Sequence, residues 1–264
     1  METRRVRLAN GVEIPYLDHG VGTPVILLHS IADSLRLFEP MLAHLPATIR
    51  AVVPSQRGHG DASRPEEGYR PEDFAGDLDL FMEALGIERA VIVGGSSGGV
   101  IARRFAIDHP ERTLALVMLG SPFALGEKAA IDEMWESTFS KLDDPIDPEM
   151  VRDFAETTLG RLVPPELVEI VIEENLKAPA HVWTATMAGL MEDRSHRELG
   201  AIDAPTLLLW GEDDAILSRE DQESMLAAIP GARLIRFPGL GHAFYLEDPE
   251  RVAGAFAAFV ESLG

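Results

Sequence analysis

The segment Val91–Ala102 constrains the fold of this chain more than any other part of the sequence. An apolar run ends at Val93, the stretch GGSSGG follows at 94–99, and a helical pattern comes next. A strand that turns at once into a helix needs small residues around the turn, because the two elements approach closely there. The sequence therefore predicts a buried strand, a sharp turn that projects a serine oxygen beyond the strand's carboxyl end, and a helix.

Two registers of Gly-x-Ser-x-Gly fit this stretch, one centred on Ser96 and the other on Ser97. The apolar run ends at Val93, which places Ser96 in the turn and Ser97 at the start of the helix. We therefore predict Ser96 as the nucleophile and keep Ser97 as the alternative. A glycine loop that cradles a phosphate is a weaker interpretation, because no lysine lies nearby and Gly-x-Gly-x-x-Gly is absent.

Short apolar runs alternate with helical patterns along most of the chain. A turn at Asn10-Gly11 between alternating residues predicts an N-terminal hairpin. Runs typical of strands buried on both faces lie at 25–28, 49–53, 90–93, 114–119, 206–210 and 233–237. Helical patterns occupy 71–85, 99–108, 219–229 and 248–263. This alternation predicts an α/β fold with a mostly parallel, doubly wound sheet.

One stretch interrupts the alternation. Residues 124–199 hold only helical patterns and proline-rich breaks. We therefore expect residues 1–123 and 200–264 to form the core, and residues 124–199 to form a helical lid inserted between two strands. Residues 127–198 carry 17 acidic and 7 basic residues. A solvated surface explains this excess, and repulsion of anionic substrates is the functional alternative.

Charge and cysteine content narrow the functions open to the chain. The formal net charge of −21 argues against binding to nucleic acid or to an anionic membrane. The absence of cysteine excludes a disulfide scaffold, a cysteine nucleophile and a thiolate metal site. No apolar run approaches the ~18 residues that a membrane span needs, and no signal-peptide pattern is visible. We expect a cytoplasmic protein, monomeric or homodimeric, that acts on a small molecule.

Five motifs together resemble those of the α/β-hydrolase superfamily, over nearly the whole chain. They are Leu27-Leu28-His29-Ser30, QRGHG at 56–60, the glycine–serine turn, GEDD at 211–214, and Gly241-His242. The overall pattern is most similar to small bacterial serine esterases and lactonases, including enol-lactonases. This resemblance implies the α/β-hydrolase fold and acyl transfer through a serine, and we expect neither a cofactor nor a metal.

The base and the acid follow from the family's chain order of serine, acid and histidine. His242 follows the last predicted strand in a glycine-rich loop, and we predict it as the general base. Asp214 ends the run of acids after the strand at 206–210, and the family pattern Gly-x-x-Asp selects it as the residue that orients the histidine. Asp213 remains the alternative acid.

The resemblance also implies an oxyanion hole made of the backbone N–H groups of Ile31 and Ser97. Relatives usually have a glycine at the position of Ser30, so this chain departs from the common motif there. His29 and His59 are interpreted as structural residues that shape their turns.

A serine nucleophile argues against the dehalogenase and epoxide-hydrolase branches, which use an aspartate. It favours hydrolysis of an ester or a lactone through an acyl-enzyme. Alternatives on the same residues are C–C bond hydrolysis, perhydrolysis, hydroxynitrile-lyase chemistry, or a slow-turnover lactone receptor. The expected substrate is neutral and partly apolar. The candidate pocket residues, for which packing of the lid is the alternative role, are Trp135, Phe139, Trp183 and Met187.

Overall fold

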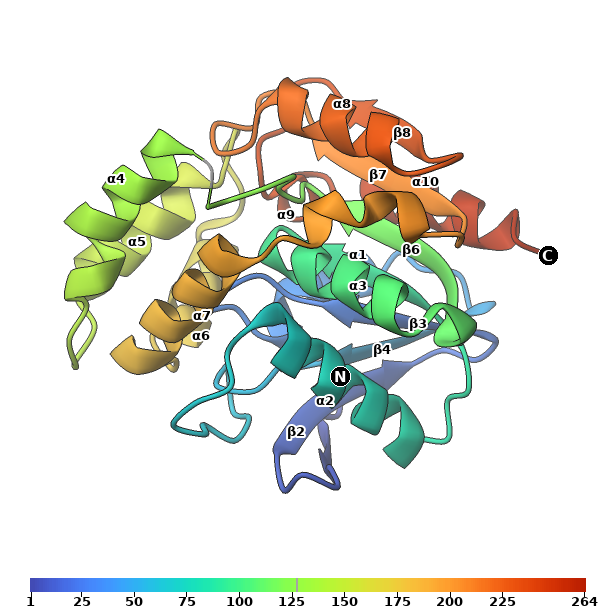
Figure 1. Cartoon of the computed structure of the whole chain (residues 1–264), viewed down its shortest axis with the longest axis horizontal. Coiled ribbons are helices and arrows are strands. Elements are labelled where there is room, and N and C mark those ends of the chain that lie inside the picture. The colour runs from blue at the N-terminus through green and yellow to red at the C-terminus, as the bar shows by residue number, and fades with distance from the viewer. Residues whose placement is uncertain (127) are drawn as a thin grey trace.

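The structure, a computed structural model, describes residues 1–126 and 128–264. Glu127, in the predicted insertion, lies outside the described residues. The described chain forms an eight-stranded sheet in the order β1-β2-β4-β3-β5-β6-β7-β8 (Figure 1). The strands are β1 Arg4–Arg7, β2 Glu13–His19, β3 Thr23–Leu28, β4 Ile49–Pro54, β5 Ala90–Gly95, β6 Thr113–Leu119, β7 Thr206–Gly211 and β8 Arg233–Phe237.

Strand β2 runs antiparallel to both β1 and β4, whereas all pairs in the remaining order β4-β3-β5-β6-β7-β8 are parallel. The prediction of a mostly parallel, doubly wound sheet is confirmed. The helices are α1 Glu39–Leu42, α2 Pro71–Ala84, α3 Ser97–Asp108, α4 Ala129–Ser137, α5 Pro148–Thr157, α6 Pro165–Asn175, α7 Ala180–Glu192, α8 Arg219–Ala228, α9 Phe244–Glu247 and α10 Pro249–Glu261. Within the described ranges, no helix is both long enough and apolar enough to cross a membrane.

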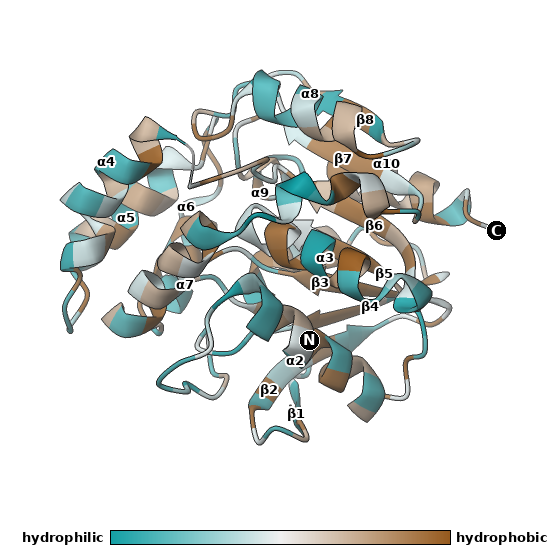
Figure 2. Ribbon diagram, in the orientation of Figure 1, coloured by the Kyte–Doolittle hydropathy of each residue, from teal (hydrophilic) through white to brown (hydrophobic). Residues whose placement is uncertain are grey.

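The central strands are apolar on both faces because helices cover both faces of the sheet. In β3, Ile26 and Leu28 belong to the core beneath α2 and α3, while Val25 and Leu27 belong to the core beneath α1 and α10. Side chains alternate between the two faces of a strand, so a strand covered on both faces reads as a continuous apolar run. Figure 2 shows these strands as the brown centre of the molecule.

Helices α4 to α7 lie between β6 and β7 in the chain, and Figure 1 shows them grouped on one side of the sheet. We call residues 124–199 the inserted segment. Its described residues share one cavity with loops that follow β3, β5, β6, β7 and β8. The inserted segment therefore lies over the carboxyl ends of the parallel strands, which is where open α/β sheets bind their ligands.

Arg103, a buried residue of α3, binds the chain at both ends of the inserted segment. The Arg103 guanidinium donates to the carbonyls of Pro122 (2.8 Å) and Phe123 (2.9 Å), where the chain enters the segment. It also pairs with Asp193 at 2.7 Å and donates to Ser195 Oγ at 2.8 Å, where the chain returns. The Arg103 and Asp193 side chains are only 1% and 2% exposed, so this is a fully desolvated ion pair.

Candidate active site

Ser96 stands at the sharp turn between β5 and α3. Pairing with β6 continues through Gly95, so the strand extends two residues beyond the apolar run. Ser96 then has φ 49° and ψ −120°, a conformation that non-glycine residues rarely adopt, and Ser97 begins the helix. A Cβ on Gly94 would lie 2.2 Å from the Gly98 carbonyl oxygen, and a Cβ on Gly98 would lie 2.4 Å from the Leu28 carbonyl oxygen. The turn therefore requires glycines on both sides, and it places Ser96 at the strained position that the first register predicts.

His242 lies between Ser96 and Asp214 in one chain of hydrogen bonds. Its Nε2 is 2.9 Å from Ser96 Oγ, and its Nδ1 is 2.8 Å from Asp214 Oδ2. A carboxylate can only accept, so Nδ1–H donates to Asp214 and Nε2 is left to accept the serine proton. The structure thus brings together the three residues that the sequence predicts for nucleophile, base and acid.

The Asp214 carboxylate is held firmly and is shielded from solvent. Its Oδ1 accepts the backbone N–H groups of Ile216 at 2.8 Å and Leu217 at 2.9 Å. The Asp214 side chain is 0% exposed, whereas Asp213 beside it faces solvent. Of the two acids that the sequence left open, only Asp214 contacts the histidine ring in the described structure.

Glu247 on α9 fixes the loop that carries His242, and sequence reasoning missed it. Its carboxylate accepts the Gly241 N–H at 3.1 and 3.0 Å, and it accepts the Gly160 N–H of the inserted segment at 2.8 Å. The Ala243 N–H donates to the Thr158 carbonyl at 2.8 Å. The histidine loop and the inserted segment are therefore joined. A lone glutamate next to the apolar run of 244–246 carries no spacing signal that would reveal this role.

The loop after β3 makes a tight turn that presents the Ile31 N–H toward α3. The Ser30 carbonyl accepts the Asp33 N–H at 3.3 Å, and Ala32 has φ 64°. In this structure the Ile31 N–H donates to Ser97 Oγ at 2.7 Å. The N–H of Ser97 stands in the first turn of α3, where such groups have no partner within the helix. Both predicted oxyanion donors are thus close together, and the Ser97 hydroxyl engages one of them.

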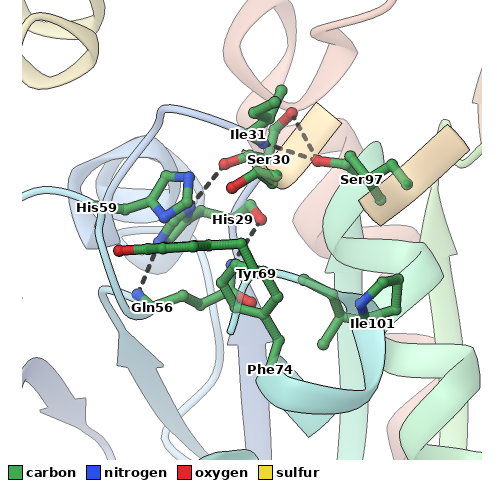
Figure 3. A pocket seen from close by; sticks show the side chains of 12 residues that line it. His29, Ser30, Ile31, Gln56, His59, Tyr69, Phe74, Ser97 and Ile101 are labelled. Carbon is green, nitrogen blue, oxygen red and sulfur yellow. Dashed lines mark hydrogen bonds between the residues drawn. The ribbon is translucent and has the colours of Figure 1, made fainter. Parts of the chain in front are cut away.

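A small pocket is lined in part by Ser30 and Ile31 of this loop, and Figure 3 shows its lining. It measures about 10 Å³, and neither Ser96 nor His242 is among the described residues that line it. His29 Nε2 accepts the Gln56 N–H at 2.9 Å, so Nδ1 carries the proton and donates to the Ser30 carbonyl at 2.7 Å. Burial lowers the pKa of His29 to about 3 and that of His59 to about 4. Both imidazoles are therefore neutral groups held within the fold.

The cavity beside Ser96 and His242, which we call the main cavity because it contains these two residues, measures about 260 Å³. Apolar side chains of the inserted segment form much of its wall, among them Ile131, Met134, Phe154, Met187 and Leu190. Its polar lining includes Asp33 and Asn175. A mostly apolar cavity with a few polar groups is the usual form of a small-molecule site.

The structure places the four predicted pocket residues differently. Met187 lines the main cavity, whereas Trp135, Phe139 and Trp183 are not among the described residues around it. The ring centroids of Phe139 and Trp183 are 5.9 Å apart, and Phe154 packs edge-on against Trp183 at 5.5 Å. Phe139 and Trp183 are buried, so their contacts with each other and with Phe154 pack parts of the inserted segment together. Phe154, which the sequence analysis did not select, reaches the cavity.

A mostly parallel sheet with a strained serine after β5, and with histidine and aspartate loops at the same edge, defines a protein of the α/β-hydrolase class. Residues 23–190 match the family described as alpha/beta hydrolase fold. The chain belongs to that family, as its motifs indicate.

Individual relatives extend this similarity over the whole chain. The chain is 28% identical over 258 residues to the AB hydrolase superfamily protein YisY of Bacillus subtilis, covering 93% of this chain and 94% of that protein. It is 28% identical over 277 residues to a 2-hydroxymuconate semialdehyde hydrolase of a Pseudomonas species, covering 98% and 94%. The solved esterase RhEst1 from a Rhodococcus species matches with a TM-score of 0.86 at 27% identity, covering 100% of both chains. Because the named reactions differ, the reaction has to be argued from the site.

Proposed function

We propose that this protein is a serine hydrolase that cleaves a carboxylic ester or a lactone. The observation that carries the proposal is the hydrogen-bond chain from Ser96 through His242 to buried Asp214, at the wall of a mostly apolar cavity of about 260 Å³. A hydroxyl is a poor nucleophile until a base takes its proton, and this arrangement supplies the base and holds it in the required tautomer.

The reaction proceeds in two half-reactions. Ser96 Oγ attacks the carbonyl carbon while its proton passes to His242 Nε2, and Asp214 stabilises the imidazolium. The tetrahedral oxyanion accepts hydrogen bonds from the Ile31 and Ser97 N–H groups, and Ile31 becomes free to donate when the Ser97 hydroxyl turns away. His242 then protonates the leaving alcohol. Water, deprotonated by His242, cleaves the acyl-enzyme and restores the serine.

The inserted segment acts in this proposal as a lid that supplies the apolar wall. The cavity suits a neutral, partly apolar substrate of small to medium size. We further propose that the protein works in the cytoplasm on a small molecule, and its net charge of −21 argues against a partner made of nucleic acid or of anionic membrane.

A second candidate is hydrolysis of a C–C bond on the same three residues. It is favoured by one observation, the full-length similarity to a protein named 2-hydroxymuconate semialdehyde hydrolase. A β-diketone offered beside an ester separates the two candidates, because the C–C reaction releases a ketone and a carboxylate.

The proposal is tested by labelling with a fluorophosphonate and by hydrolysis of p-nitrophenyl acetate. Ser96→Ala is expected to abolish both, because it removes the attacking oxygen. Ser97→Ala is the matched control, and it is expected to keep both, since it removes only the hydroxyl that engages the Ile31 N–H. Activity that survives in Ser96→Ala but is lost in Ser97→Ala would show that the nucleophile is misassigned.

A further inference from the structure

Asp33 is an acidic side chain in the wall of the cavity that contains Ser96 and His242. It follows the tight turn after β3, two residues beyond Ile31. Its Oδ1 accepts a hydrogen bond from Asn175 Nδ2 of α6 at 2.8 Å. Its other oxygen, Oδ2, has no hydrogen-bond or ion-pair partner among the residues that the structure describes.

Two cations follow Asp33 and its partner Asn175 closely in the chain, and both are paired with other carboxylates. Arg36 lies 3.4 Å from Glu39 and 3.8 Å from Glu174, and Lys177 lies 3.0 Å from Glu174 and 3.2 Å from Asp61. Glu174 itself is buried and acts on Asp33 as a like charge. Glu174 is therefore the carboxylate that acts on Asp33, and the side-chain donor that Asp33 has among the described residues is the neutral amide of Asn175.

This environment changes the protonation of Asp33. Burial, with a smaller contribution from the Glu174 charge, raises the pKa of Asp33 to about 7, although the Asn175 hydrogen bond acts in the opposite direction. The phenol of Tyr245, which also lines the cavity, remains protonated because burial raises its pKa. An acidic group with an unused oxygen is costly in an apolar wall unless something binds it.

We propose that Asp33 recognises a hydrogen-bond donor on the substrate, so that the preferred ester or lactone carries a hydroxyl, amide or ammonium group at a distance from the scissile carbonyl. This inference rests on the proposed function, because it concerns the substrate of the same site. A hydroxyl can bond to either protonation state of the acid, and an ammonium group stabilises the ionised state. A substrate carboxylate at the same place is repelled by Asp33 and Glu174.

The test compares pairs of substrates that differ only by a hydroxyl and a methyl group. One pair is p-nitrophenyl 3-hydroxybutyrate and 3-methylbutyrate, and the longer pair is p-nitrophenyl 6-hydroxyhexanoate and heptanoate. For the wild type, kcat/KM is expected to favour the hydroxyl member of at least one pair by roughly tenfold or more, as one hydrogen bond to an acid provides. A p-nitrophenyl 6-aminohexanoate is expected to react faster than the heptanoate.

Two variants separate recognition from structure. Asp33→Leu is expected to bring the hydroxyl preference close to one, while Asp33→Asn keeps part of that preference and loses the preference for the amine. Asp61→Asn is the matched control, because it removes one charge from an exposed acid that pairs with Lys177 outside the cavity, and its ratios are expected to equal those of the wild type. A purely structural Asp33 would slow both members of each pair equally.

The outcomes are distinct. Wild-type ratios near one for all pairs, or a hydroxyl preference that survives in Asp33→Leu, would overturn the role of Asp33, while hydrolysis dependent on Ser96 leaves the proposed function standing. If the wild type hydrolyses none of these esters, both the proposed function and this inference fail.

Discussion

Asp214 and Asp213 are chemically identical neighbours with very different surroundings. The Asp214 side chain is fully buried and bonded to His242, whereas Asp213 is exposed. Asp214→Asn is expected to lower kcat for p-nitrophenyl acetate by roughly 10³- to 10⁴-fold, because an amide in this place favours the wrong imidazole tautomer. Asp213→Asn carries the same change of charge and is expected to retain wild-type kcat. Equal losses in the two variants would leave the acid unassigned.

For individual residues, the sequence predicted the candidates for nucleophile, base and acid, but it did not predict the contacts between side chains. The glycines around Ser96 could be recognised in the sequence because the turn leaves no room for a Cβ, and Asp214 and His242 were predicted from the chain order that the family resemblance implies. The bond from Ile31 to the Ser97 hydroxyl, and the roles of Asp33 and Glu247, depend on which groups meet in space. No spacing within one stretch of the sequence predicts those contacts.

The inserted segment depends on α3 through Arg103. Arg103→Leu leaves the buried Asp193 carboxylate without its cation, and it is expected to lower the free energy of unfolding by about 3–5 kcal/mol. Arg70→Leu is the matched control, since Arg70 also links the core to the segment through Glu192, but both of its partners are more than 60% exposed. That variant is expected to cost no more than about 1 kcal/mol in urea denaturation. Comparable losses would contradict the importance of burial.

The helices of the inserted segment were predictable as helices, but not the directions in which they face. Trp135, Phe139, Trp183 and Met187 are all large and apolar, so composition alone cannot separate cavity lining from packing. In the structure Met187 lines the cavity, whereas Phe139 and Trp183 pack against each other and against Phe154. The strands of the sheet were easier to predict, because burial on both faces leaves a continuous apolar run.

The stability of the whole molecule is expected to depend on pH through the ionisation of Asp33. The folded pKa of about 7 lies above the ordinary value of 3.8, so between these values the unfolded chain releases a proton that the folded chain retains. Wild-type stability therefore falls as pH rises through that window. Asp33→Asn lacks this ionisation and retains an oxygen for Asn175. Its thermal midpoint is expected to exceed that of the wild type increasingly from pH 4 to pH 7 and by a constant margin above pH 7.

Measuring the difference between the two proteins removes the other titrating groups. Asp18, whose pKa is lowered chiefly by its hydrogen bond with Arg50, and the buried His29 and His59 contribute equally to both. A midpoint difference that does not change between pH 4 and pH 7 would show that Asp33 ionises normally in the folded protein.

The contacts of Glu247 bear on how this molecule can be re-engineered. The Glu247 carboxylate joins the chain after α5 to the loop that carries His242, so the positions of these two regions depend on each other. A chimaera that grafts the helical segment of a relative onto this sheet must also place a backbone N–H group where the Gly160 N–H donates to Glu247. Without it, Glu247 has one donor fewer, and the loop that carries His242 loses one of its constraints although neither Glu247 nor Gly160 lines the cavity.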